Sequence, residues 1–124
     1  MSDFLTLAEV IAIHKMLIDR YGGAPGIRDM GALEAALYRP QTGYYEDVVQ
    51  EASALWESIS QNHPFIDGNK RVAFAVTDTF LRINGLKLAV SSEKTEAFIY
   101  GLFDENVFVY SSIEPWLRKN IKPA

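Results

Sequence analysis

The chain has 124 residues, no cysteine and a formal net charge of −4, and 48% of its residues are hydrophobic. This length supports a single domain, residues 1–124, with a core that needs no disulfide or metal, and the lack of cysteine excludes thiolate zinc sites. The acidic balance argues against direct binding of nucleic acid or of an anionic membrane. The first residues, MSDFLTLAEV, lack a signal-peptide pattern, and no apolar run approaches membrane-spanning length. We therefore expect a cytoplasmic protein.

A first helix is predicted after a capping box, T-L-A-E, at Thr6 to Glu9. Apolar residues follow at helical spacing, and the run YGGAPG, Tyr21 to Gly26, ends the helix. These glycines follow a helix and not a strand, so we interpret them as structural punctuation and not as a phosphate loop. His14 lies on the apolar stripe of this helix, where a core histidine bonded to the main chain is expected in preference to a catalytic or metal-binding one.

A second, shorter helix is predicted from about Asp29 to Tyr38, with Asp29 as its N-cap and with its end near Pro40. The next segment, RPQTGYYED, reads as a loop or a small hairpin-like flap. A third helix is expected to begin near Glu46.

The third and fourth helices are expected to form the centre of the fold. The apolar stripe of the third helix runs out at His63, on the same face as the core. The fourth helix opens at about Asn69, has the clearest helical period in the chain, and ends at Asn84-Gly85.

The C-terminal third is predicted to hold two further helices. Weak alternation over Leu86 to Val90 favours an extended segment, and a fifth helix follows Ser91 or Ser92. Ser111 to Glu114 reads as a capping box for a last helix, which carries Ile113, Trp116, Leu117 and Ile121. The sequence thus predicts an all-α bundle of about six helices with at most a short β flap.

The stretch NHPFIDGNKRVAF, Asn62 to Phe74, leads directly into the fourth helix. The first N–H groups of a helix have no partner within it and favour phosphate. They belong here to Gly68, Asn69, Lys70 and Arg71. Glycine leaves room for an anion beside the backbone, and the three side chains add an amide, a point charge and a planar fork. These residues predict an anion site.

Asp67 would repel a bare phosphate, but it suits a site in which Mg²⁺ lies between the carboxylate and the phosphates. His63, four residues upstream, can accept a proton at cellular pH. A base, a metal carboxylate and a positive cradle are the parts of phosphate-group transfer. The alternative is a plain turn and helix cap with Lys70 and Arg71 in solvent, although cations at a helix start oppose its dipole.

The stretch HPFIDGNKR resembles the signature of the Fic/Doc family, His-Pro-Phe-x-Asp/Glu-Gly-Asn-x-Arg. RYGGAPGIRDMGALEAAL and SSIEPWLRKN resemble the Doc (death-on-curing) branch, so the resemblance covers most of the chain. It implies a helical bundle with this loop between two central helices. It also implies roles for particular residues: His63 as general base, Asp67 as Mg²⁺ ligand, and the four residues 68–71 as the anion site. Phe65 would be the buried anchor of the loop.

Two departures from the Fic pattern indicate the chemistry. Many Fic enzymes read Gly-Asn-Gly-Arg-x-x-Arg and transfer AMP from ATP, whereas this chain has Lys70 in place of the second glycine and Phe74 in place of the second arginine. Both changes are similar to Doc toxins, in which the γ-phosphate of ATP is transferred. The resemblance therefore implies an ATP- and Mg²⁺-dependent kinase-like toxin that inhibits translation, with a translation factor such as elongation factor Tu as target. The segment 39–47 would take the place of the family's flap.

Two other function classes stay open. AMP transfer to a protein hydroxyl is the second enzyme reading, and a catalytically silent nucleotide-binding module is the alternative outside enzymes. A helix-turn-helix DNA-binding protein is the weakest reading, because the chain is acidic.

The resemblance also implies a partner. Doc proteins are neutralised by an antitoxin whose disordered tail folds onto the toxin. Some Fic proteins instead carry an inhibitory helix, Ser/Thr-x-x-x-Glu-Gly/Asn. Ser92 to Glu96 is followed by Ala97, and Gly101 stands where Glu105-Asn106 would need Ser or Thr, so neither stretch matches. We therefore expect inhibition in trans.

Other polar and aromatic residues have less specific readings. Arg71, Asp78 and Arg82 share a face of the fourth helix, which suits either an ion-paired surface or a contact to substrate or adenine. Trp56 and Trp116 occupy core positions, and we assign them no function.

Overall fold

The computed structural model describes residues 2–124. Within this range the chain forms six α-helices and one short sheet. Its elements are α1 (Leu7–Tyr21), α2 (Met30–Tyr38), the 3-10 helix η1 (Arg39–Gln41), α3 (Val48–Asn62), α4 (Asn69–Ile83), β1 (Leu86–Leu88), α5 (Ser92–Asp104), α6 (Tyr110–Asn120) and β2 (Ile121–Pro123). The prediction of an all-α fold of about six helices is confirmed.

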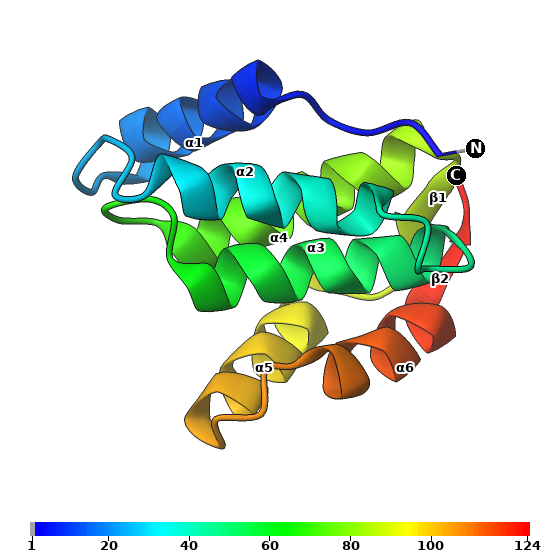
Figure 1. The fold of residues 1–124 in the computed structure, drawn as a ribbon. Helices are drawn as coiled ribbons and strands as arrows, with labels where there is room; N and C mark the ends of the chain where they lie inside the picture. Colours follow the sequence, from blue (N-terminus) through cyan, green and yellow to red (C-terminus); the bar gives the residue numbers. More distant parts are fainter. Residues whose placement is uncertain (1) are drawn as a thin grey trace.

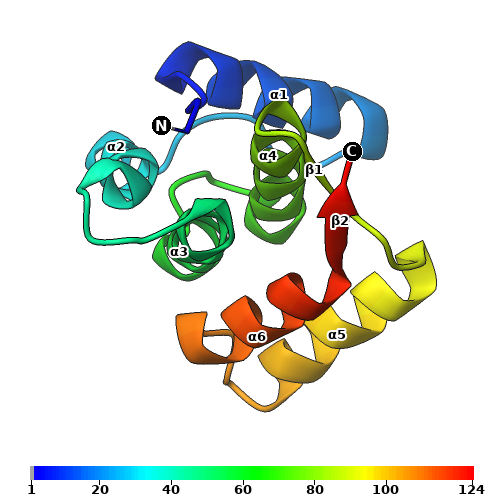
Figure 2. The same ribbon diagram turned by 90° about the vertical axis from the view of Figure 1, so that its right-hand side faces the viewer.

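Helix α4 lies in the middle of the molecule. Viewed end on, it has α1 above it, α3 beside it, and α5 and α6 below (Figure 2). Both α3 and α4 contribute many buried apolar side chains, so they form the centre of the core, as predicted. These side chains are Ala52, Leu55, Trp56 and Ile59 from α3, and Val72, Ala73, Val76, Phe80 and Leu81 from α4.

An aromatic cluster joins the lower layer to this centre. Trp56 of α3 is 1% exposed, and its ring lies 5.4 to 6.2 Å from the rings of four other aromatic residues. They are Phe74, Phe98, Phe108 and Trp116. Pairs at these distances add to the energy of area burial. Trp56 is a core residue, and Trp116 is partly buried and packs against the core.

The caps at the N-terminal ends of α1 and α2 are local and agree with prediction. The Thr6 hydroxyl accepts a hydrogen bond from the Glu9 N–H at 3.2 Å, and the Glu9 carboxylate accepts from the Thr6 N–H at 2.8 Å. Asp29 accepts from the Ala32 N–H at 3.0 Å and caps α2. Each cap satisfies a main-chain donor that the helix leaves free.

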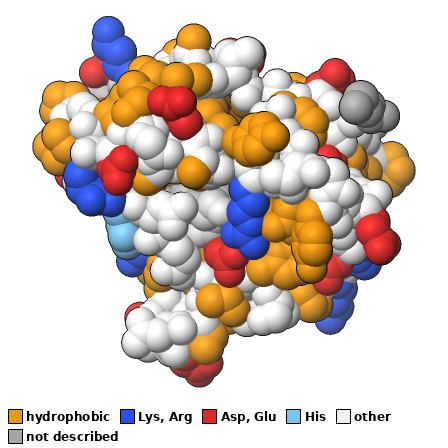
Figure 3. Space-filling model, viewed as in Figure 1, with side chains coloured by type: hydrophobic (Ala, Val, Ile, Leu, Met, Phe, Trp, Pro, Cys, Tyr) orange, Lys and Arg blue, Asp and Glu red, His pale blue; other side chains and the backbone are white. Residues whose placement is uncertain are grey.

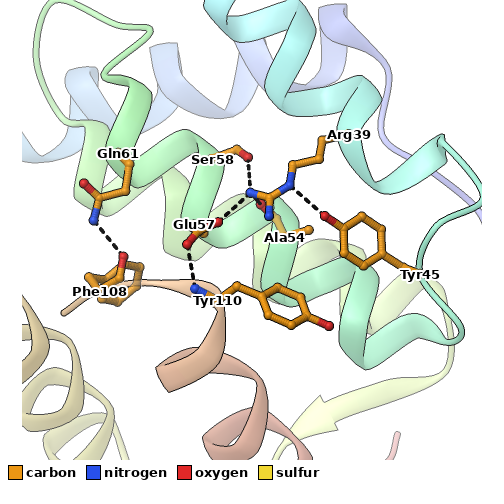
Figure 4. Close-up of polar contacts among 8 residues, drawn as sticks. All are labelled: Arg39, Tyr45, Ala54, Glu57, Ser58, Gln61, Phe108 and Tyr110. Atoms are coloured by element: carbon orange, nitrogen blue, oxygen red, sulfur yellow. Dashed lines mark hydrogen bonds and ion pairs between the residues drawn. The ribbon is translucent and has the colours of Figure 1, made fainter.

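The predicted capping box of the last helix is wrong. Helix α6 begins at Tyr110, one residue before Ser111, and its N-cap residue is Val109, whose side chain cannot accept a hydrogen bond. Glu57 of α3 takes over this role and accepts from the Tyr110 N–H at 2.6 Å (Figure 4). The same carboxylate pairs with Arg39 at 2.6 Å.

The extended segment after α4 is confirmed, but its partner was not predicted. Strand β1 pairs antiparallel with β2, with Leu88 opposite Ile121. Ile121 therefore belongs to a strand and not to the last helix. The two strands lie at the end of the molecule where both termini lie (Figure 1).

The segment 39–47 does not occupy the place of a flap. It leads into the N-terminal end of α3, whereas His63 follows the C-terminal end of this helix. Fifteen residues of helix separate the two, which is about 22 Å. The segment that lies beside the α3–α4 loop is the connection from α1 to α2, residues 22–29 (Figure 1).

Candidate active site

The loop between α3 and α4 turns sharply at both of its ends. His63 ends α3 in the left-handed conformation, with φ 46° and ψ 57°. A residue other than glycine in this region costs about 1–3 kcal/mol, so the surrounding contacts must hold it. Gly68 precedes α4 with φ 75°, and a Cβ atom there would lie 3.3 Å from the Ile18 side chain. The loop thus brings His63 and the start of α4 to one surface.

The connection 22–29 binds the loop through main-chain hydrogen bonds. The N–H groups of Arg28 and Asp29 both donate to the Pro64 carbonyl, at 2.8 and 3.0 Å, and the Ile66 N–H donates to the Gly26 carbonyl at 3.1 Å. Ile27 and Phe65 form an isolated antiparallel bridge.

Glycine in this connection is needed for close approach to the loop. A Cβ atom on Gly23 would lie 2.8 Å from Oδ2 of Asp67, and Gly23 has a φ of 118°. The Ala24 N–H donates to the same oxygen at 3.1 Å. The sequence reading of YGGAPG as helix punctuation is correct but incomplete, because the run also packs against the motif.

The interior of the loop is fixed by Phe65 and Asn69. Phe65 is 1% exposed, as expected for the anchor of the loop. Oδ1 of Asn69 accepts from the Phe65 N–H, and Nδ2 of Asn69 donates to the Phe65 carbonyl, both at 2.9 Å. The Asn69 side chain therefore shapes the loop, and only its main-chain N–H is directed by the helix start toward an anion.

His14 of α1 packs against the inner side of the loop. It is 4% exposed and stacks on the Phe65 ring at 3.8 Å. Its Nε2 lies 2.8 Å from the Asp67 carbonyl oxygen, and since a carbonyl only accepts, the ring donates its proton there. The prediction of a core histidine bonded to the main chain is confirmed, and the group that it binds belongs to the motif.

The Asp67 carboxylate lies at the surface and is ionised. Hydrogen bonds from the Ala24 and Gly68 N–H groups lower its pKa, and the charge of Arg71 acts in the same direction. The Gly68 N–H donates to Oδ1 of Asp67 at 2.8 Å, so this amide is engaged within the loop. The main-chain donors left for an anion are those of Asn69, Lys70 and Arg71.

Lys70 and Arg71 point to opposite sides of the start of α4. The Lys70 ammonium lies 4.3 Å from the centre of the Phe103 ring of α5, and the Arg71 guanidinium lies 4.4 Å from that of Tyr21 at the end of α1. A cation over an aromatic ring is attracted by the ring quadrupole, by about 0.5–1 kcal/mol at exposed sites. The two cations therefore flank the helix terminus.

All six predicted site residues line one cleft of about 520 Å³. They are His63, Asp67, Gly68, Asn69, Lys70 and Arg71. The rest of the lining includes Phe74 of α4 and, from α5, Glu96, Ile99 and Tyr100. Figure 3 shows histidine surface beside Lys and Arg side chains at the edge where this loop lies.

The residues present fit nucleotide phosphates and Mg²⁺. The helix start and the two flanking cations suit phosphate oxygens. No group of three or more His, Asp or Glu side chains in residues 2–124 is arranged to hold a metal by itself. The ionised carboxylate of Asp67 agrees with Mg²⁺, which is commonly bound through one or two carboxylates together with substrate phosphates.

The three polar residues that share a face of α4 have different surroundings. Asp78 and Arg82 form an ion pair at 3.3 Å, as in the surface reading. Arg71 faces the cleft, and all three residues also line a second cleft of about 650 Å³ between α1, α4 and α5.

None of the helices in residues 2–124 has the length and apolar character needed to cross a bilayer.

Comparison with known proteins agrees with this architecture. The model of the Fic/DOC family matches residues 4–81. The chain is similar to the protein named Toxin Doc from Mycolicibacterium smegmatis, with 38% identity over 102 residues that cover 78% of this chain and 76% of that protein. It is also similar to Protein kinase doc from Escherichia phage P1, with 40% identity over 115 residues that cover 90% of each. The chain belongs to the Fic/DOC family.

Proposed function

We propose that this protein is a Doc-type toxin that transfers the γ-phosphate of ATP to a hydroxyl group of a translation factor, with elongation factor Tu as the first target to test. The observation that carries the proposal is the single cleft that gathers His63, Asp67 and the start of α4. The similarity to a protein named as a kinase, over 90% of both chains, supports phosphotransfer.

The roles of the residues follow from their chemistry. His63 accepts the proton of the target hydroxyl. The hydroxyl oxygen attacks the γ-phosphorus, and ADP leaves. The N–H groups at the start of α4, with Lys70 and Arg71, hold the phosphates and stabilise the charge that develops on them. Asp67 would hold Mg²⁺, which neutralises phosphate charge when bound.

AMP transfer is the second candidate, and two residues disfavour it. The glycine position of AMP-transferring Fic enzymes is Lys70 here, and its ammonium adds a cation beside the helix start. Phe74 replaces the second arginine and packs partly buried against Trp56, with ring centres 5.8 Å apart. An apolar side chain there gives no second clamp for phosphate.

We further propose that a separate antitoxin, with a disordered tail that folds on the toxin, restrains the protein in the cytoplasm. The name of the mycobacterial relative, a toxin, supports this partner. Normal growth of bacteria that overproduce the folded protein alone would contradict it.

A cell-free bacterial translation reaction with purified protein and Mg·ATP tests the function. We expect protein synthesis to stop with the unaltered chain and to continue with His63→Ala or Asp67→Asn. Mass spectrometry of the elongation factor should then show one added phosphoryl group. Equal inhibition by the unaltered chain and both variants would instead support the silent binding module.

A further inference from the structure

The carbonyl groups at the end of α3 are bound by an arginine from the α1–α2 connection. Carbonyls in the last turn of a helix have no partner within it. Nε of Arg28 donates to the His63 carbonyl at 2.6 Å, and Nη2 of Arg28 donates to the Asn62 carbonyl at 2.7 Å. Such short bonds from a charged donor are among the strong hydrogen bonds in proteins. The guanidinium also suits the negative end of the helix dipole.

These two bonds fix the peptide planes on both sides of His63. The Asn62 carbonyl belongs to the plane that precedes His63, and the His63 carbonyl belongs to the plane that follows it. The φ and ψ angles of His63 are the rotations between these planes, so the planar fork of one guanidinium restrains both angles. The next carbonyl, that of Pro64, accepts from the Arg28 and Asp29 N–H groups. Three consecutive carbonyls are thus held by two adjacent residues.

We propose that Arg28 is a positioning residue that keeps His63 in its left-handed conformation and so directs the imidazole into the cleft. The inference rests on the proposed function of His63 as the base. His63 is not a glycine, so without these bonds the conformation at φ 46° is unfavourable. Arg28 does not line the cleft that gathers the motif residues, which separates its role from binding of phosphate.

Steady-state transfer kinetics of Arg28→Ala and Arg28→Lys test the proposal. We expect kcat to fall by roughly 10- to 100-fold in Arg28→Ala, because a misplacement of about 1 Å in a reacting group can cost about 10²-fold, with KM for ATP nearly unchanged. Arg28→Lys should recover part of the loss, because an ammonium can reach one carbonyl but lacks the fork. Arg118→Ala is the matched control, since Arg118 also makes two contacts at the surface but binds Asp47 at the far end of α3.

The combination with His63→Ala decides how Arg28 acts. If it acts through His63, then Arg28→Ala causes no further loss in the His63→Ala background. An equal loss in both backgrounds, or a raised KM for ATP with unchanged kcat, would overturn the proposal and make Arg28 a group that binds substrate.

A measurement without turnover separates this inference from the proposed function. Carbonyl carbon and backbone chemical shifts from NMR report the torsion angles of His63 in each folded variant. We expect His63 to leave the left-handed region in Arg28→Ala and to keep it in Arg118→Ala. Unchanged shifts at Asn62 and His63 in Arg28→Ala would overturn the positioning role, even if the chain had no transfer activity. A change in these shifts with no transfer by the unaltered chain would keep the role and reject the function.

Discussion

At the scale of residues, individual side chains packed against the α3–α4 loop hold its shape. Asn69 binds both main-chain groups of Phe65, and His14 binds the Asp67 carbonyl while it stacks on Phe65. Neither interaction requires a substrate. The loop is therefore preorganised, which lowers the cost of assembling a transition state.

Asn69→Asp is predicted to destabilise the fold and to abolish transfer. An aspartate can still accept from the Phe65 N–H, but it places a carboxylate against the Phe65 carbonyl where Nδ2 now donates. We expect a loss of about 1–3 kcal/mol in the free energy of unfolding, measured by urea denaturation. Asn120→Asp is the control, since Asn120 donates from Nδ2 to the Trp116 carbonyl, far from the loop. An Asn69→Asp protein of unchanged stability would contradict this reading of the loop.

The lowered pKa of Asp67 predicts how stability depends on pH. The folded state favours the ionised carboxylate of Asp67, which therefore adds to the free energy of unfolding. This contribution is present above the ordinary pKa of an aspartate, about 3.9, and is lost as the pH falls through the lowered pKa of the folded state. Asp67→Asn cannot titrate. We expect the unaltered chain to exceed Asp67→Asn in urea midpoint at about pH 6 and the difference to shrink at about pH 2.5. A difference that is constant over this range would show that the folded state does not favour the ionised carboxylate.

At the scale of elements, helix caps divide into local and long-range ones. The caps of α1 and α2 come from Thr6 and Asp29, next to the helices that they start, and the sequence predicts both. The cap of α6 comes from Glu57, on another helix. No local pattern contains such a contact, and the Ser-x-x-Glu match at residue 111 therefore misplaced the cap.

Glu57→Ala is predicted to lower stability by about 1–3 kcal/mol, because it leaves the Tyr110 N–H and Arg39 without their shared acceptor. Chemical denaturation measures the loss. Glu114→Ala is the matched control: its partner Arg118 is exposed and one helical turn away, so we expect a change of about 0.5 kcal/mol or less. Equal effects of the two substitutions would show that Glu57 is an ordinary surface residue.

At the scale of the whole molecule, the two ends carry different elements. The end with the termini carries the short sheet and the α2–α3 connection, and the other end carries the motif loop and the connection 22–29 (Figure 1). The sequence predicts the central helices and six of the residues that line the cleft, because these six fall within nine residues that lead into a periodic helix. It does not predict that Gly23, Ala24 and Arg28 contact this loop, since their partners lie 34 to 44 residues away along the chain.

The position of the segment 39–47 also could not be predicted from the sequence. Its order in the sequence, before the two central helices, suited a flap beside the motif. The direction of α3 carries it away from the site, and this depends on how the helices pack. Residues 22–29 occupy the position beside the loop instead.

The most direct test of the central claim is label transfer from ATP that carries radioactive phosphate at either the α or the γ position. Purified protein and His63→Ala would each be incubated with Mg²⁺, labelled ATP and a bacterial lysate free of antitoxin. Phosphotransfer predicts a labelled protein band from γ-labelled ATP alone, and no band with His63→Ala. A band from α-labelled ATP would contradict phosphotransfer in favour of AMP transfer, and no band from either label would contradict the assignment of a transferase.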